Sequence, residues 1–85
     1  MLLYFRYDRS DGRPGEYPFG RPVDVMQALS LAGGTTSFAA LNDIVILRRE
    51  NGVLRALPFR YAEVEHGKSL AQNILLESGD TVVVP

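Results

Sequence analysis

The sequence predicts an α+β fold in which a mixed sheet of four to five strands packs on one helix. Three observations predict it: residues 24–34 carry both a helix start and a helix end, the apolar segments around them are short, and Asn51-Gly52 is a strong hairpin signal. The 85 residues are the size of one domain, so we expect a single domain over residues 1–85.

Two strands are expected before the helix. Residues 2–7 are rich in aromatic and apolar side chains, which is typical of a strand. In the turn that follows, Pro14 sets φ and Gly15 can take the positive φ of a type II turn. Residues 16–19 are expected as a short second strand, and Pro18 indicates a sheet edge or strand end because it has no N–H.

The helix is expected over residues 25–32. Asp24 can accept an N–H of the first turn, and Gln27 three residues later completes a capping box. Gly33-Gly34 ends the helix, because glycine readily takes the left-handed conformation. Apolar residues at helical spacing form one face: Val25, Ala28, Leu29 and Ala32, widened by Met26 and Leu31.

A hairpin is expected after the helix and a loop. Residues 43–49 contain a continuous apolar run, which suits a strand covered on both faces. Asn51-Gly52 turns the chain, and residues 53–59 form the return strand, whose Pro58 puts its end at an edge. Residues 60–71 hold either a helical turn or an irregular crossing.

A short strand, a turn and a final strand are expected to complete the sheet. Residues 73–76, which begin with Asn73, are the short strand. In the turn that follows, Asp80 after Gly79 is interpreted as a side chain that accepts turn N–H groups, not as a catalytic carboxylate. The β-branched residues 81–84 should pair inside the sheet. With the last strand at the centre, this order is a β-grasp arrangement.

The composition narrows the classes of function. The net charge of −1 gives no electrostatic reason to expect a nucleic-acid partner. The chain has no cysteine, which excludes a disulfide framework and a thiolate metal site. The apolar run at residues 1–5 is too short for a signal-peptide core, and residues 25–42 are too polar to span a membrane.

The sequence contains no pattern typical of a catalytic site. No acid–base pair or activated nucleophile emerges, so we expect no enzymatic activity and no cofactor. A metal site would need His66, the one histidine, together with Glu63 and Glu65, and an exposed, inert His66 is the favoured interpretation.

Basic and aromatic residues supply the candidate contacts. Arg48, Arg49 and Arg55 flank the hairpin turn, and Arg48 should lie opposite Arg55. Either an anionic sugar or a neighbouring subunit's carboxylate relieves this repulsion, or the arginines form a solvated face with Glu50 as a diagonal partner; the solvated face is favoured. Among the aromatic residues, Tyr17, Phe19 and Phe38 are more typical of a core than of sugar stacking, and Tyr4 and Tyr61 fit either a core or an interface.

Four segments, in order, resemble the soluble-ligand-binding β-grasp (SLBB) domain found in bacterial polysaccharide export proteins of the outer membrane. They match its turn-and-strand entry, helix end, hairpin strand and closing segment. In this chain they are residues 13–18, Ala28-Leu-Ser-Leu-Ala-Gly-Gly34, residues 42–48, and residues 73–76 followed by Gly79-Asp-Thr-Val-Val-Val-Pro85.

The resemblance implies a non-catalytic binding and assembly module of a capsule or exopolysaccharide export channel. Its expected partners are the polysaccharide, copies of itself or sibling modules in a ring, and an inner-membrane polysaccharide copolymerase. The full-length protein would be periplasmic and associated with the outer membrane. The alternative is a stand-alone β-grasp adaptor that binds a protein partner through an exposed strand edge.

Overall fold

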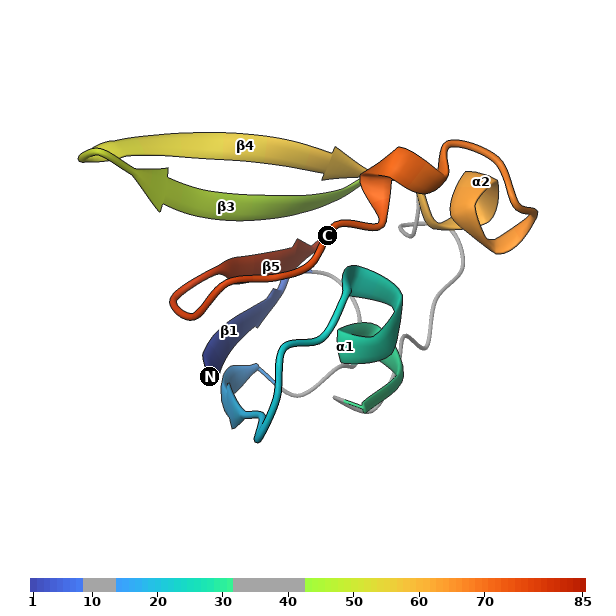
Figure 1. Cartoon of the computed structure of the whole chain (residues 1–85). Helices are drawn as coiled ribbons and strands as arrows, with labels where there is room; N and C mark the ends of the chain where they lie inside the picture. Colours follow the sequence, from blue (N-terminus) through green and yellow to red (C-terminus); the bar gives the residue numbers. More distant parts are fainter. Residues whose placement is uncertain (9–13, 32–42) are drawn as a thin grey trace.

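The computed structural model describes residues 1–8, 14–31 and 43–85. These residues form a five-stranded mixed sheet with one main helix, which confirms the α+β prediction and is compatible with a β-grasp fold (Figure 1). The elements in chain order are β1 (Leu2–Tyr7), β2 (Gly15–Pro18), α1 (Val25–Leu31), β3 (Ile44–Glu50), β4 (Val53–Phe59), α2 (Tyr61–Glu65), the 3₁₀ turn η2 (Leu70–Gln72) and β5 (Thr81–Val84).

The last strand lies at the centre of the sheet, as predicted. The strand order is β2-β1-β5-β3-β4, with β5 parallel to β1 and antiparallel to β3. Val82, Val83 and Val84 are all buried, because β5 has a neighbouring strand on each side. β2 and β4 are the two edge strands, which agrees with the edge positions predicted from Pro18 and Pro58.

One core joins the sheet to α1. Alternate residues of the strands point to the inner face, because side chains in a strand alternate between faces. The helix packs on that face (Figure 1). The buried members from the sheet are Leu3, Phe5, Ile44, Ile46, Phe59, Val82 and Val84, and those from the helices are Val25, Ala28, Leu29 and Val64.

The N-terminus of α1 is fully hydrogen-bonded. The Asp24 N–H donates to Gln27 Oε1 at 3.0 Å and the Gln27 N–H donates to Asp24 Oδ1 at 2.8 Å, which confirms the capping box. The Met26 N–H donates to Asn73 Oδ1 at 3.0 Å, and the Val25 N–H donates to the Ile74 carbonyl at 3.2 Å. The first-turn donors are therefore all used, and the helix end offers no anion site.

Three expectations are wrong in detail. Residues 73–76 are not a strand: one bridge pairs Asp24 with Leu75, and the surrounding backbone caps α1 instead of extending a ladder. β3 is not covered on both faces, since Ile44 and Ile46 are buried but Val45 and Leu47 are only half-buried. Leu31 is 63% exposed, because it lies roughly a third of a helical turn away from the buried stripe.

Several predictions concern residues that the structure does not describe. Gly33 and Gly34 at the helix end, the loop anchor Phe38, and residues 9–13 of the first turn lie outside the described residues. Pro14 and Gly15, the last two residues of that predicted turn, are described. Gly15 has φ +133°, so the predicted positive φ is present, and it forms the first residue of β2.

Replacing Asp24 with Ala should lower the free energy of unfolding by about 1 kcal/mol, because the Gln27 N–H loses its acceptor. The measurement is urea denaturation followed by circular dichroism. Asp24→Asn is the matched control, since the amide oxygen still accepts the bond. Equal stability of Asp24→Ala and the parent chain would contradict the capping role.

Candidate functional site

The β3–β4 hairpin extends beyond the rest of the sheet. β3 pairs with β5 only along residues 45–47, whereas it pairs with β4 along its whole length. Residues 48–55, here called the ribbon, therefore project past β5 as two strands (Figure 1). Asn51 and Gly52 have φ of 52° and 79°, so the predicted two-residue hairpin turn is confirmed as type I′.

Arg48 and Arg55 face each other across the ribbon, as predicted from the turn. Each has its own carboxylate partner within the chain. Arg55 Nη1 lies 2.9 Å from Glu50 Oε2, which is the predicted diagonal pair. Arg48 Nη2 lies 2.8 Å from Asp80 Oδ2, and Arg48 Nη1 lies 2.9 Å from Glu77 Oε2. The repulsion between the two cations is thus offset without a bound ligand.

Asp80 connects β3 to the turn before β5. Its side chain is 2% exposed, and it accepts bonds from Arg48 Nε at 3.1 Å and from the Glu77 N–H at 2.8 Å. The predicted turn role is confirmed, but the partnership with Arg48 has no local sequence signal, because the two residues are 32 positions apart. Hydrogen bonding to Asp80, more than any other factor, raises the pKa of the Arg48 guanidinium above its ordinary value.

The arginines do not form a single surface. The Arg48 side chain is only 11% exposed, whereas Arg49 and Arg55 are accessible. Arg49 is adjacent to Arg48 in the strand, so it points to the opposite, outer face of the sheet. Its Nη1 donates to the Gly52 carbonyl at 3.3 Å, and it makes no ion pair with any residue that the structure describes.

Tyr61 lies away from the arginines. It begins α2, at the end of β4 opposite to the turn (Figure 1). Its ring is half-buried against the core, and burial, followed by a hydrogen bond with Glu65, raises the pKa of its phenol. Tyr17 and Phe19, which the sequence favours as core residues, pack against the core, while Tyr4 is exposed.

β4 presents an open backbone edge over Leu54 and Ala56, whereas η2 borders the other end, where the N–H of Arg60 donates to Gln72 Oε1 at 2.8 Å. In an antiparallel pair, hydrogen-bonded and non-hydrogen-bonded residue pairs alternate, and the pair that closes a two-residue turn is hydrogen-bonded. Glu50 and Val53 close the turn, so the N–H and C=O groups of Leu54 and Ala56 point away from β3. Pro58 occupies the next outward position, where the absence of an N–H costs no bond to β3.

The side chains around this edge are partly apolar and accessible. Val53 is 62% exposed and Leu54 is 53% exposed, and both are uncharged. Leu54, Ala56 and Pro58 share the outer face of β4, where each is exposed. Apolar side chains beside unpaired backbone groups are the features that a strand-adding partner recognises.

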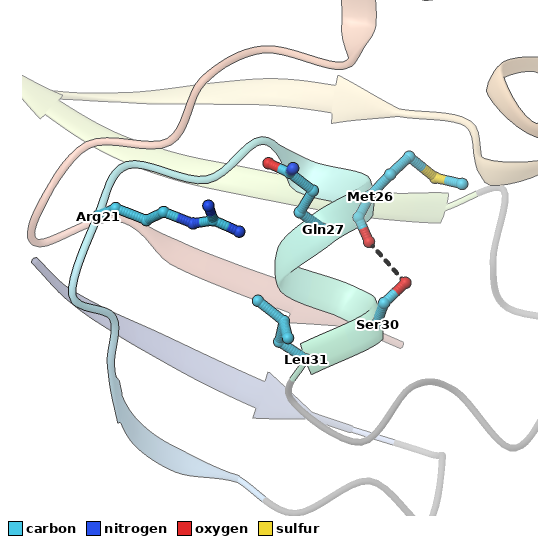
Figure 2. A pocket seen from close by; sticks show the side chains of 5 residues that line it. All are labelled: Arg21, Met26, Gln27, Ser30 and Leu31. Carbon is cyan, nitrogen blue, oxygen red and sulfur yellow. Dashed lines mark hydrogen bonds between the residues drawn. The ribbon is translucent and has the colours of Figure 1, made fainter.

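Two hollows are lined by described residues, and neither set of lining residues forms a catalytic or metal-binding group. The larger, about 300 Å³ and widely open, is lined by Arg21, Met26, Gln27, Ser30 and Leu31. Figure 2 shows the Arg21 side chain extending from the segment before α1 toward Gln27. The Ser30 hydroxyl donates to the Met26 carbonyl at 3.0 Å, and the Gln27 amide oxygen belongs to the capping box. None of the described residues that line it is aromatic.

The smaller hollow and the acidic residues of α2 likewise show no arrangement typical of a binding site. The hollow, about 170 Å³, is mainly apolar and lies between β4 and η2. His66 is exposed, and its Nδ1 lies 2.7 Å from the Ala62 carbonyl. Glu63 accepts a bond from Ser69 at 2.8 Å. In the described part of the chain, no three ligand-type residues gather in a group able to hold a metal ion.

No protein-family model matches the chain, and no curated protein matches it. None of the described helices has the length and apolar character that a membrane span requires.

Replacing Arg48 with Met should lower the free energy of unfolding by about 3 kcal/mol, because the buried Asp80 carboxylate loses its cation. Arg49→Met is the matched control and should change it by less than about 0.5 kcal/mol, since Arg49 is exposed. Both values come from urea denaturation. Equal effects of the two substitutions would show that Arg48 is an ordinary surface residue.

Proposed function

We propose that the chain is a non-catalytic binding and assembly module of a capsule or exopolysaccharide export channel. The observation that carries the proposal is how the segments resembling the SLBB domain are used in this fold. Their described parts supply β2, the second half of α1, β3 and β5, so they are the framework of the sheet and not scattered surface matches. The strands from residues 42–48 and 79–85 pair with each other at the sheet centre.

The proposed partners follow from the resemblance. They are the polysaccharide, copies of the module or sibling modules in a ring, and an inner-membrane polysaccharide copolymerase, in a periplasmic, outer-membrane-associated protein. The accessible guanidinium groups of Arg49 and Arg55 are the favoured contacts for an anionic sugar, because arginine binds carboxylates in a bidentate manner. Arg48 is not a contact in this proposal, since its donors bind Asp80 and Glu77.

A second candidate is a β-grasp adaptor that binds a protein through an exposed strand. The specific observation in its favour is the outward-facing backbone of Leu54 and Ala56 on β4. This candidate places binding along the strand, whereas glycan binding would centre on the arginines of the ribbon.

Titration of the ¹⁵N-labelled chain with alginate oligosaccharides, which carry carboxylates, should shift the amide signals of residues 49–55. The combined variant Arg49→Gln and Arg55→Gln should bind alginate between about twofold and about thirtyfold more weakly, because exposed ion pairs each contribute about 0.2 to 1 kcal/mol. Neutral dextran should produce smaller shifts at the same residues.

Arg6→Gln is the matched control for this titration. It removes one exposed cation of β1, Arg6, which pairs with Asp8. Because β1 is not part of the ribbon, the alginate affinity should stay unchanged. Alginate shifts that are absent, or that are unaffected by the ribbon substitutions but weakened by Arg6→Gln, would contradict the proposed glycan contact.

A further inference from the structure

We propose that the turn end of the ribbon docks at the surface of a lipid bilayer that carries anionic headgroups. This inference goes beyond the proposed function, and it depends on apolar side chains that the glycan contact does not use. Val53 is 62% exposed and Leu54 is 53% exposed, and they directly follow the Asn51-Gly52 turn. Scattered exposed apolar side chains are ordinary, but adjacent ones on a projecting element are typical of a contact surface.

The shape of the ribbon restricts the kind of partner. Its two strands project past β5, and the hollows near α1 and η2 are lined by residues outside the ribbon (Figure 1). Small molecules bind in clefts that enclose most of their surface, and a projecting pair of strands has no concave wall. The partner must therefore accept a convex tip, as a fluid bilayer does.

The two faces of the ribbon disfavour a flat partner. Val53 and Arg55 lie on its inner face, whereas Leu54 and Arg49 lie on its outer face, because side chains alternate along a strand. A flat surface against one face would leave an exposed apolar side chain and a guanidinium of the other face in water. A medium that surrounds the tip contacts all four side chains. The interfacial layer of a bilayer is such a medium.

The charges of the ribbon favour an anionic surface. Arg49 and Arg55 are exposed, and the single acid of the ribbon, Glu50, has its carboxylate 2.9 Å from Arg55 Nη1. Arg48 is already neutralised by its own ion pairs. Two accessible cations thus stand against one acid. Apolar side chains flanked by arginine are typical of shallow docking at the interface, where the guanidinium groups reach headgroups while the apolar groups sit deeper.

Tryptophan fluorescence tests the docking, because the chain has no native tryptophan. The probe is vesicles of about 70% phosphatidylcholine and about 30% phosphatidylglycerol, with lipid up to about 10 mM, since two side chains bind more weakly than one myristoyl chain. The emission of Leu54→Trp should shift to shorter wavelength on these vesicles. Leu70→Trp is the matched control and should not shift: Leu70 is 60% exposed but belongs to η2, at the end of β4 opposite to the turn (Figure 1).

NMR line broadening of the ¹⁵N-labelled chain measures the native side chains. The vesicles should broaden the amide signals of residues 49–55 first. The double variant Val53→Thr and Leu54→Thr should bind about tenfold or more weakly, because it removes apolar groups while threonine keeps the strand preference. Leu70→Thr should bind like the parent chain. Unchanged folding is checked by urea denaturation.

A variant of opposite sign tests the role of charge. Glu50→Gln removes the single acid of the ribbon, so it should bind the anionic vesicles about fivefold more tightly. Vesicles of phosphatidylcholine alone should bind the parent chain about tenfold or more weakly. Equal emission shifts at positions 54 and 70, no shift at position 54, or undiminished binding of the double threonine variant would overturn the docking.

These outcomes are separate from those of the proposed function. The double threonine variant keeps both exposed guanidinium groups of the ribbon, so it should bind alginate like the parent chain. A chain that binds alginate but not the vesicles keeps the glycan contact and loses the membrane docking. A chain that binds the vesicles but not alginate keeps the docking and loses the glycan contact.

Discussion

The buried ion pair between Arg48 and Asp80 is the interaction on which the position of the hairpin depends. Asp80 ends the turn before β5, and Arg48 lies where β3 leaves the three-stranded centre of the sheet. Nη2 of the same guanidinium donates to the Leu75 carbonyl at 3.1 Å, and Nη1 reaches Glu77. A single side chain therefore fixes the hairpin to the segment that caps α1. Burying these charges is tolerable because each finds its partner.

That constraint explains how the ribbon can project without support from β5. Beyond Arg48, the two strands hold only each other, and an isolated hairpin is marginally stable in water. The type I′ turn at Asn51-Gly52 and the ion pair at its base hold the two ends of the ribbon. The edge of β4 is consequently held in an extended conformation. A preorganised edge binds another strand with less loss of conformational entropy.

Local signals in the sequence predicted most of the fold. The capping box of Asp24 and the Asn51-Gly52 turn each involve residues close together in the sequence. A short sequence pattern is therefore enough to predict them. Residues 73–76 do not form the expected strand, because the Ile74 carbonyl and the Asn73 side chain accept N–H groups of α1, about 50 residues earlier in the chain. The facing positions of Arg48 and Arg55 follow from the two-residue turn, and the opposite face of Arg49 follows from strand alternation. The pairing of Arg48 with Asp80 depends on the tertiary register of β3 and β5, and no spacing rule predicts it.

The coupling energy between Arg48 and Asp80 tests the central claim most directly. A double-mutant cycle with Arg48→Met and Asp80→Asn measures it by urea denaturation, and Asp80→Asn keeps an oxygen for the Glu77 N–H. The expected coupling is about 2 kcal/mol, well above that of the exposed Arg55–Glu50 pair measured in the same way. A coupling below about 0.5 kcal/mol, no larger than that of the exposed pair, would contradict the account.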